Sequence, residues 1–343
     1  MRTRPLGRSG IDVSVVTLGS MNFGKDLDER EGVELVAAYL DHGGNFLDTA
    51  DCYADGLSET IVGAARRRLG DRFAICTKTG RPMFDDERQS GYAPQRLRNA
   101  LEASLRRLGV DHVEMYQLHQ WDPAVPVEDA VETLAALRDE GKIGAFGIGN
   151  VPAWALGQAY GFCRGRAIAG ADAYQYHYSL GCRDAEAEIL PACVAHGAGL
   201  MAWSPLSGGL LTGKYATQPG ASGPRRGDKP VGRRGYGFER LADGWPAICE
   251  SLRLVADRTG TSMTAVALSW LLSRPGVVTA VIGARSPAQL AETIGTPLPE
   301  LGPEYLAALT ENAPAVTPYP QDFLTQVLPG WDLMAVTRRE AVG

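Results

Sequence analysis

The sequence of 343 residues lacks the features of several large classes of protein. No apolar run is long enough to cross a bilayer, and no apolar segment follows the basic residues at the start of the chain, so neither a membrane span nor a secretory signal is expected. The formal net charge of −6 provides no overall basic field that would attract nucleic acid. The composition therefore predicts a cytoplasmic protein that binds neither membranes nor nucleic acid.

Cysteine is sparse, and its spacing excludes two further classes. The six cysteines are scattered and form no Cys-x-x-Cys pair. Such spacing favours reduced thiols over a disulfide framework or a zinc site, and we predict no bound metal.

A regular alternation of short apolar runs and longer amphipathic segments fills the chain. The predicted strands are 15–20, 45–49, 73–78, 112–119, 143–150, 171–176, 200–203 and 277–282. The predicted helices are 29–42, 58–69, 94–108, 127–140, 152–163, 184–196, 245–274 with a break at Gly260, and 286–294. Eight strands alternating with helices indicate either a doubly wound open sheet or a (β/α)8 barrel.

The barrel fits better for three reasons. The chain has eight repeating units, no linker long enough to separate domains, and no Gly-x-Gly-x-x-Gly after its first strand. We predict a single domain over residues 1–343, classed as α/β with a (β/α)8 TIM barrel. Segments 4–6 and 13–15 flank the turn 7–10 and predict an N-terminal hairpin that plugs the barrel. Residues 204–244 predict a long loop after strand seven, on the catalytic face.

Four side chains at or near predicted strand ends form a proton-delivery set: Asp48, Tyr53, Lys78 and His119. Tyrosine is too weak an acid at neutral pH to protonate an alkoxide efficiently, and a neighbouring ammonium would lower its pKa. Lys78 can supply that charge, Asp48 can hold Lys78, and His119 can bind a carbonyl oxygen. Taken singly, these residues also have ordinary structural explanations: an ion pair, a core histidine and a loop aromatic.

Six motifs resemble the aldo-keto reductase family, in order, from residue 4 to about residue 295. They are residues 6–24, 46–59 (FLDTADCYADGLSE), 113–123 (VEMYQLHQWDP), 174–178 (YQYHY), 202–215 (AWSPLSGGLLTGKY) and 281–290 (VIGARSPAQL). The resemblance includes the bacterial-type members and the branch that contains channel β subunits. It implies a reductase in which Tyr53 is the general acid, Lys78 and Asp48 tune it, and His119 polarises a carbonyl.

The resemblance also implies an NADPH site. Asn150 and Gln175 would hold the nicotinamide carboxamide and Trp203 would stack on its ring, while Arg285 would bind the 2′-phosphate and so favour NADPH over NADH. The full implied cofactor set is Gly19, Ser20, Met21, Asp48, Asn150, Gln175, Trp203, Ser204, Pro205, Leu206, Gly208, Lys214, Gly283, Ala284, Arg285, Gln289, Glu292 and Thr293. Gly149 and Thr293 depart from the family, which usually has serine and asparagine there. His119 is retained where a glutamate accompanies carbon–carbon double-bond reduction, which favours carbonyl reduction.

Two other functions match parts of the sequence. Residues 208–215 nearly match an ATP-binding P-loop, but Tyr215 replaces the Ser or Thr that binds magnesium. A regulatory subunit that binds nicotinamide cofactor with little turnover is the main alternative, and the absence of a long extension before the hairpin favours a free enzyme. The substrate is a small-molecule carbonyl whose identity depends on loops near 22–26 and 81–91, on the tail from 317, and on pocket residues Asn22 and Trp121. The sequence leaves the oligomeric state open.

Overall fold

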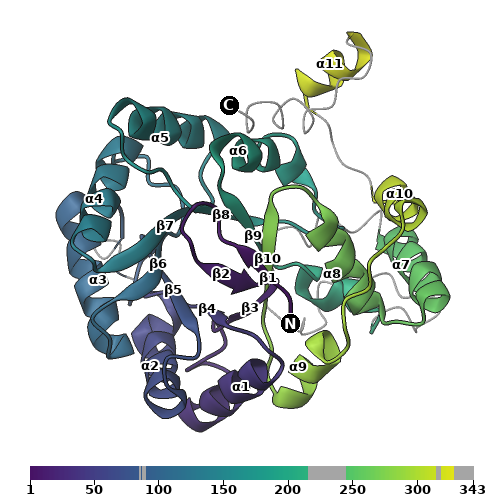
Figure 1. Cartoon of the computed structure of the whole chain (residues 1–343), viewed down its shortest axis with the longest axis horizontal. Coiled ribbons are helices and arrows are strands. Elements are labelled where there is room, and N and C mark those ends of the chain that lie inside the picture. Colours follow the sequence, from purple (N-terminus) through teal and green to yellow (C-terminus); the bar gives the residue numbers. More distant parts are fainter. Residues whose placement is uncertain (85, 87–89, 215–244, 314–317, 328–343) are drawn as a thin grey trace.

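In the computed structural model, eight parallel strands close into a barrel in the order β10-β3-β4-β5-β6-β7-β8-β9. The structure describes residues 1–84, 86, 90–214, 245–313 and 318–327. Figure 1 looks along the barrel and shows the helices arranged around the ring of strands. The fold is therefore the predicted (β/α)8 barrel.

The elements have the following bounds. The strands are β1 Thr3–Pro5, β2 Asp12–Ser14, β3 Val16–Gly19, β4 Phe46–Asp48, β5 Ala74–Thr79, β6 Val113–Leu118, β7 Ile143–Gly149, β8 Ala173–His177, β9 Gly199–Trp203 and β10 Val277–Ile282. The helices are α1 Glu29–Asp41, α2 Leu57–Leu69, α3 Pro94–Leu108, α4 Val127–Asp139, α5 Ala153–Gly165, α6 Ile189–His196, α7 Trp245–Thr259, α8 Met263–Ser273, α9 Pro287–Ile294, α10 Pro303–Glu311 and α11 Gln321–Val327. The 3₁₀ turns among the described residues are η1 Tyr53–Gly56, η3 Asp184–Glu186 and η4 Ser207–Thr212.

The eight predicted strands correspond to β3 through β10, within a few residues at each end. The predicted helix over 184–196 is instead the 3₁₀ turn η3 followed by the short helix α6. Helices α10 and α11 were not predicted. Ser286 caps α9 by accepting a hydrogen bond from the backbone N–H of Gln289, with Pro287 in the first turn as the sequence indicated.

The hairpin β1–β2 closes the amino-terminal end of the barrel, where Figure 1 shows it lying across the ring. Leu6 and Val13 are fully buried and pack with residues of the barrel interior. Arg4 donates hydrogen bonds to the carbonyl oxygens of Val277 at 2.6 Å and Leu272 at 2.9 Å. The predicted plug is confirmed, and it lies at the end of the barrel opposite the carboxyl ends of the strands, where barrels of this kind carry their active sites.

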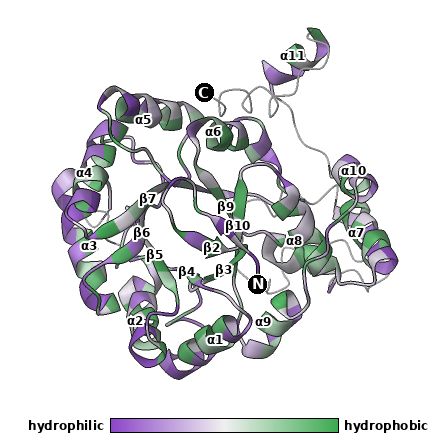
Figure 2. Ribbon diagram, viewed as in Figure 1, coloured by the Kyte–Doolittle hydropathy of each residue, from purple (hydrophilic) through white to green (hydrophobic). Residues whose placement is uncertain are grey.

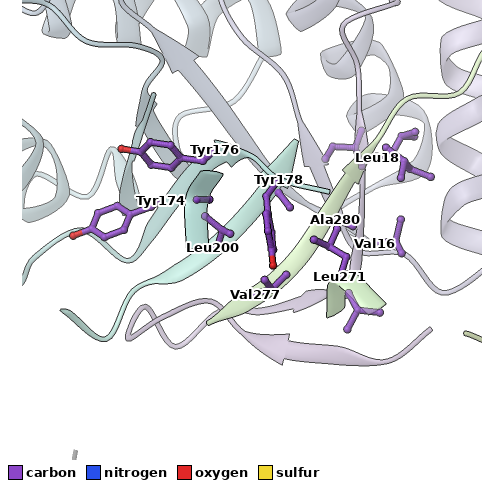
Figure 3. Close-up of a cluster of buried hydrophobic side chains, with 14 of the residues drawn as sticks. Val16, Leu18, Tyr174, Tyr176, Tyr178, Leu200, Leu271, Val277 and Ala280 are labelled. Carbon is purple, nitrogen blue, oxygen red and sulfur yellow. The ribbon is translucent and has the colours of Figure 1, made fainter. Parts of the chain in front are cut away.

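Alternation along each strand separates the core into two clusters. On β8, Tyr174 and Tyr176 point outward into the layer between strands and helices, beside Leu200 of β9 (Figure 3). Ala173 belongs to the inner cluster, and Gln175 has the same inward parity. Figure 2 shows largely hydrophobic barrel strands, and helices such as α2, α3 and α4 that carry hydrophilic residues. This packing fixes which strand residues reach the barrel interior.

The long loop predicted over 204–244 is described only up to residue 214. That part forms a turn and η4 directly after β9. Residues 215–244, with the two basic pairs near 225 and 233, lie outside the described residues, as do residue 317 and the last residues of the tail from 328 onward.

Candidate active site

Three neighbouring strands carry polar side chains to the open end of the barrel. Asp48 ends β4, Lys78 lies one residue before the end of β5, and His119 follows β6 directly. Phe46 and Cys76 belong to the inner cluster, so the residues two positions later, Asp48 and Lys78, share that inner face. The alternation thus directs a carboxylate and an ammonium into the same buried space.

The Lys78 ammonium joins the parts of this site. It donates to Asp48 Oδ2 at 2.8 Å, to the carbonyl oxygen of Thr49 at 2.5 Å and to the hydroxyl of Tyr53 at 3.3 Å. A lysine ammonium has three N–H donors, and these contacts use all of them. Lys78 is only 1% exposed, and a charge so deeply buried is tolerated when it is paired and hydrogen-bonded in this way.

Tyr53 is held by a short, strained turn. It begins η1, in which Ala54 and Asp55 have φ values of 48° and 50°, a region that costs energy for residues other than glycine. The carboxylate of Asp51, just before the turn, accepts a hydrogen bond from Thr79 Oγ1 at 2.5 Å. The turn is therefore tied to the end of β5, beside Lys78.

Burial and charge act in opposite directions on the pKa values of this pair. Burial raises the pKa of Tyr53 to about 12, and the Lys78 ammonium offsets only part of that increase. The Lys78 ammonium lowers the pKa of Tyr53, as predicted, but desolvation of the phenolate outweighs this effect, so the net shift is upward. Burial alone would lower the pKa of Lys78, but Asp48 and Tyr53 raise it above its usual range. Both groups are thus protonated at neutral pH.

His119 is neutral and has defined neighbours. Its pKa is lowered well below the usual value by burial and then by the positive charges of Lys78 and Arg81. Its Nδ1 lies 3.7 Å from the sulfur of Cys52. Its ring meets that of Tyr53 edge to face, with 5.6 Å between centroids and an angle of 81°. A neutral imidazole here can donate one hydrogen bond without adding positive charge.

Two amide side chains connect this group to the other side of the barrel. Asn150 Nδ2 donates to the carbonyl oxygen of His119 at 2.8 Å, and its Oδ1 accepts from Trp203 Nε1 at 3.1 Å. Gln175 Nε2 donates to Asp48 Oδ1 at 2.9 Å. Each amide nitrogen has a second N–H. The two residues predicted to hold a carboxamide therefore lie next to the catalytic candidates.

Trp203, at the end of β9, has one face of its indole covered by a neighbouring ring. This ring is that of His177, which stacks on the indole with 4.4 Å between centroids and 16° between the planes. After Trp203 the chain turns sharply, since Ser204 and Ser207 have φ values of 55° and 49°. Directly after β9 come the predicted cofactor residues Ser204, Pro205, Leu206 and Gly208. Lys214 lies close to the same turn, since a Cβ added to Gly209 would be 2.8 Å from its Nζ.

Arg285, predicted to bind a phosphate, pairs with a carboxylate of this chain. Its Nε donates to Asp26 Oδ2 at 3.2 Å, which links the loop after β10 to the loop after β3. Its backbone N–H donates to Gln289 Oε1 at 2.8 Å. Thr293 donates its hydroxyl proton to the carbonyl oxygen of Gln289 at 3.0 Å, and Glu292 is exposed. Gly283 and Ala284 lie between β10 and Arg285.

The segment after β3 combines a buried and an exposed residue. Ser20 is fully buried: its hydroxyl donates to the carbonyl oxygen of Asp48 at 3.1 Å and contacts Ser58 Oγ at 2.7 Å. Met21 is 55% exposed. The side chain of Asn22 lies next to Gly283: a Cβ added to this glycine would be 3.7 Å from Asn22 Nδ2. The hydroxyl of Ser20 therefore supports the end of β4. Gly19 is the last residue of β3, and a Cβ at this position would lie only 3.2 Å from the carbonyl oxygen of Ile282.

Comparison with known families agrees with this geometry. The model of the aldo/keto reductase family matches residues 15–312, which include the whole barrel. The chain belongs to the aldo/keto reductase family.

Relatives of this aldo/keto reductase include enzymes and channel subunits. It is 34% identical to the uncharacterized oxidoreductase YrpG of Bacillus subtilis, over 90% of this chain and 95% of that protein. It is 32% identical to a probable voltage-gated potassium channel subunit beta of Arabidopsis thaliana, over 86% and 90% of the two chains. It is 32% identical to the human aflatoxin B1 aldehyde reductase member 4, over 74% and 78%. These similarities support an oxidoreductase.

The predicted pocket residue Trp121 lies at the rim of the reductase barrel. Its backbone N–H donates to the carbonyl oxygen of Asn150 at 3.2 Å. Its ring meets Trp154 of α5 edge to face at 5.3 Å, and Trp154 is 63% exposed. Trp121 is partly buried against the core, so it combines packing with a position near the site.

Sequence reasoning missed three neighbours of the predicted site residues: Cys52, Asp26 and His177. Cys52 precedes Tyr53, and nothing in its own residue type indicated a contact with His119. Asp26 is 259 positions from Arg285. His177 has the inward parity of Gln175 on β8, and this alternation is the one signal that could have placed it.

A cavity of about 1000 Å³ lies at the other end of the barrel and contains none of these residues. It is lined by the hairpin turn at Arg8 and by residues of α4, α5 and α6, among them Arg138, Tyr160 and His196. Among the described residues, no group of three or more potential ligands could hold a metal ion. Within the same part of the chain, no helix has both the length and the apolar character needed to cross a membrane.

Proposed function

We propose that this aldo/keto reductase reduces an aldehyde or ketone to an alcohol, with NADPH as hydride donor and Tyr53 as proton donor. The observation that carries the proposal is the position of Lys78 Nζ, 2.8 Å from the carboxylate of Asp48 and 3.3 Å from the hydroxyl of Tyr53. An ammonium so placed stabilises the phenolate that forms when Tyr53 gives up its proton.

NADPH, when bound, supplies the hydride for the carbonyl carbon, which no side chain can do. Tyr53 delivers its proton to the carbonyl oxygen as negative charge develops there. Asp48 keeps Lys78 charged and oriented while the phenolate exists. His119, neutral because of burial and the charges of Lys78 and Arg81, donates a hydrogen bond to the same oxygen and orients the carbonyl.

The residues at the mouth of the barrel fit a nicotinamide cofactor. His177 stacks on one face of the Trp203 indole, and the opposite face would stack on the nicotinamide ring. Asn150 and Gln175 each have an amide N–H beyond the one used within the protein, which suits a carboxamide oxygen. Arg285 can grip a 2′-phosphate with its guanidinium, which favours NADPH over NADH.

The substrate is a small carbonyl compound that approaches past Asn22 and Trp121. The retained histidine at position 119 favours reduction of a carbonyl over that of a carbon–carbon double bond. Partly exposed tryptophan at the rim favours a substrate with apolar surface next to its carbonyl group.

The Tyr53→Phe variant tests the proposal. It removes the proton donor and keeps the ring that packs on His119, so turnover should fall by about 100-fold or more. NADPH binding, followed by fluorescence titration, should stay close to that of the wild type. Tyr160→Phe on α5 is the matched control and should keep full activity. Undiminished NADPH oxidation by Tyr53→Phe, with an aldehyde that the wild type reduces, would contradict the proposal.

A second candidate function is a cofactor-binding regulatory subunit with little turnover. The similarity to a probable potassium channel subunit beta supports it. A panel of chemically distinct aldehydes and ketones, assayed by NADPH oxidation, separates the two functions. Tight NADPH binding without turnover on any member of the panel would favour the regulatory subunit.

A further inference from the structure

Cys52 lies against the histidine of the site although it takes no part in the proton delivery described above. Its sulfur is 3.7 Å from His119 Nδ1, within hydrogen-bonding range for sulfur. Within the described part of the chain, this is the one hydrogen bond of the imidazole for which a side-chain partner is identified. The rings of Tyr53 and His119 also meet in an edge-to-face arrangement.

The backbone on both sides of this contact is firmly held. The N–H of His119 donates to the carbonyl oxygen of Thr79 at 2.9 Å, and its carbonyl oxygen accepts from Asn150. On the other side, Asp51 is fixed by Thr79 Oγ1 at 2.5 Å. The thiol and the imidazole consequently face each other from two anchored segments.

A neutral imidazole has one N–H and one bare nitrogen, and the partner of one nitrogen decides which atom carries the proton. Burial, helped by the charge of Asp51, raises the pKa of Cys52 to about 11, so the thiol keeps a proton to donate. A bare imidazole nitrogen is a good acceptor, whereas a thiol sulfur is a weak one. The hydrogen bond in which the thiol S–H donates to the bare imidazole nitrogen is therefore stronger than the reverse one, in which the imidazole N–H would donate to sulfur.

We propose that Cys52 is a positioning residue: its thiol donates a hydrogen bond to Nδ1 of His119 and holds the imidazole in the tautomer with its proton on Nε2. The consequence for catalysis rests on the proposed function, because Nε2–H is then the donor to the substrate carbonyl oxygen. In the opposite tautomer, Nε2 would be bare and would repel that oxygen.

Nuclear magnetic resonance of the full chain, with ¹⁵N-labelled histidine, tests the assignment without any substrate. The chain has five histidines, and the signals of His119 are identified by their loss in His119→Gln. The wild type should carry its His119 proton on Nε2. Cys52→Ala should populate the Nδ1–H tautomer, and Cys52→Ser, which keeps an O–H donor, should restore the wild-type pattern. Cys163→Ala, a buried cysteine on α5, is the matched control and should change nothing.

Steady-state kinetics then connects the tautomer to the reaction. Cys52→Ala should lower kcat by about fivefold, the factor that one hydrogen bond of ordinary net strength is worth. Cys52→Ser should recover most of this loss, and the KM for NADPH should not change in either variant. A His119 proton on Nδ1 in the wild type, or an unchanged tautomer in Cys52→Ala, would overturn the proposal. If Tyr53→Phe keeps full turnover, the proposed function fails, while the resonance experiment still decides the role of Cys52.

Discussion

At the residue scale, the two cationic side chains that matter most in this reductase are held very differently. Lys78 is buried and uses all three of its N–H donors on acceptors of the protein. Arg285 has a side chain that is 45% exposed and pairs with Asp26, itself 33% exposed. A pair this open contributes little to stability, so its guanidinium can exchange one anion for another at small cost.

In the proposed function Arg285 binds the 2′-phosphate of NADPH, and Asp26, which pairs with its guanidinium, should compete with that phosphate. Asp26→Asn should therefore lower the Kd for NADPH by about two- to fivefold, the range expected from losing an exposed ion pair. The Kd for NADH, which has no 2′-phosphate, should stay the same and serves as the internal control. Both constants come from fluorescence titration. An equal change for the two cofactors would place the effect elsewhere than at Arg285.

At the scale of elements, the hairpin β1–β2 performs a structural task at the end of the barrel opposite the site. Leu6 is fully buried in the inner cluster, so Leu6→Ala should lower the free energy of unfolding by about 2–5 kcal/mol. Leu254→Ala, at a position 44% exposed on α7, is the matched control and should stay within about 0.5 kcal/mol. Urea unfolding measures both. A change in KM for the carbonyl in Leu6→Ala would show that the plug also shapes the site.

The strands were easier to predict from the sequence than the exact bounds of the helices. Strands such as β10, predicted over 277–282, were found because a fully buried strand is a continuous apolar run bounded by turn residues. Helix α6 begins only at Ile189 because η3 precedes it, and no periodic pattern separates a 3₁₀ turn from the first turn of a helix.

The candidate site followed from the same alternation only in part. Position on adjacent strands was enough to bring Asp48 and Lys78 together. The sequence could not predict the net direction of the pKa shift of Tyr53, because that direction depends on how completely the folded chain removes water from the phenol. The contacts of Cys52 with His119 and of Asp26 with Arg285 arise between loops, whose paths no sequence pattern specifies.

At the scale of the whole molecule, buried titratable groups link folding to pH. Burial raises the pKa of Asp51 and of Asp172 from 3.8 to about 6. Burial also lowers the pKa of His196 to about 4. A carboxyl group with a raised folded-state pKa stabilises the protein below pH 4 and loses that contribution as pH rises through 6. His196 acts in the opposite sense, since its contribution is lost as pH falls toward 4.

Asp51→Asn isolates one of these contributions. The asparagine cannot ionise, so the free energy of unfolding of the variant minus that of the wild type should increase between pH 4 and pH 7. A shift of about two pKa units corresponds to an increase of up to about 3 kcal/mol. Asp111→Asn, at an exposed position, is the matched control and should show no such trend. Urea unfolding at several pH values gives the curves. A difference that is constant across this range would mean that Asp51 has its ordinary pKa in the folded protein, and that Thr79 and Arg96 compensate fully for its burial.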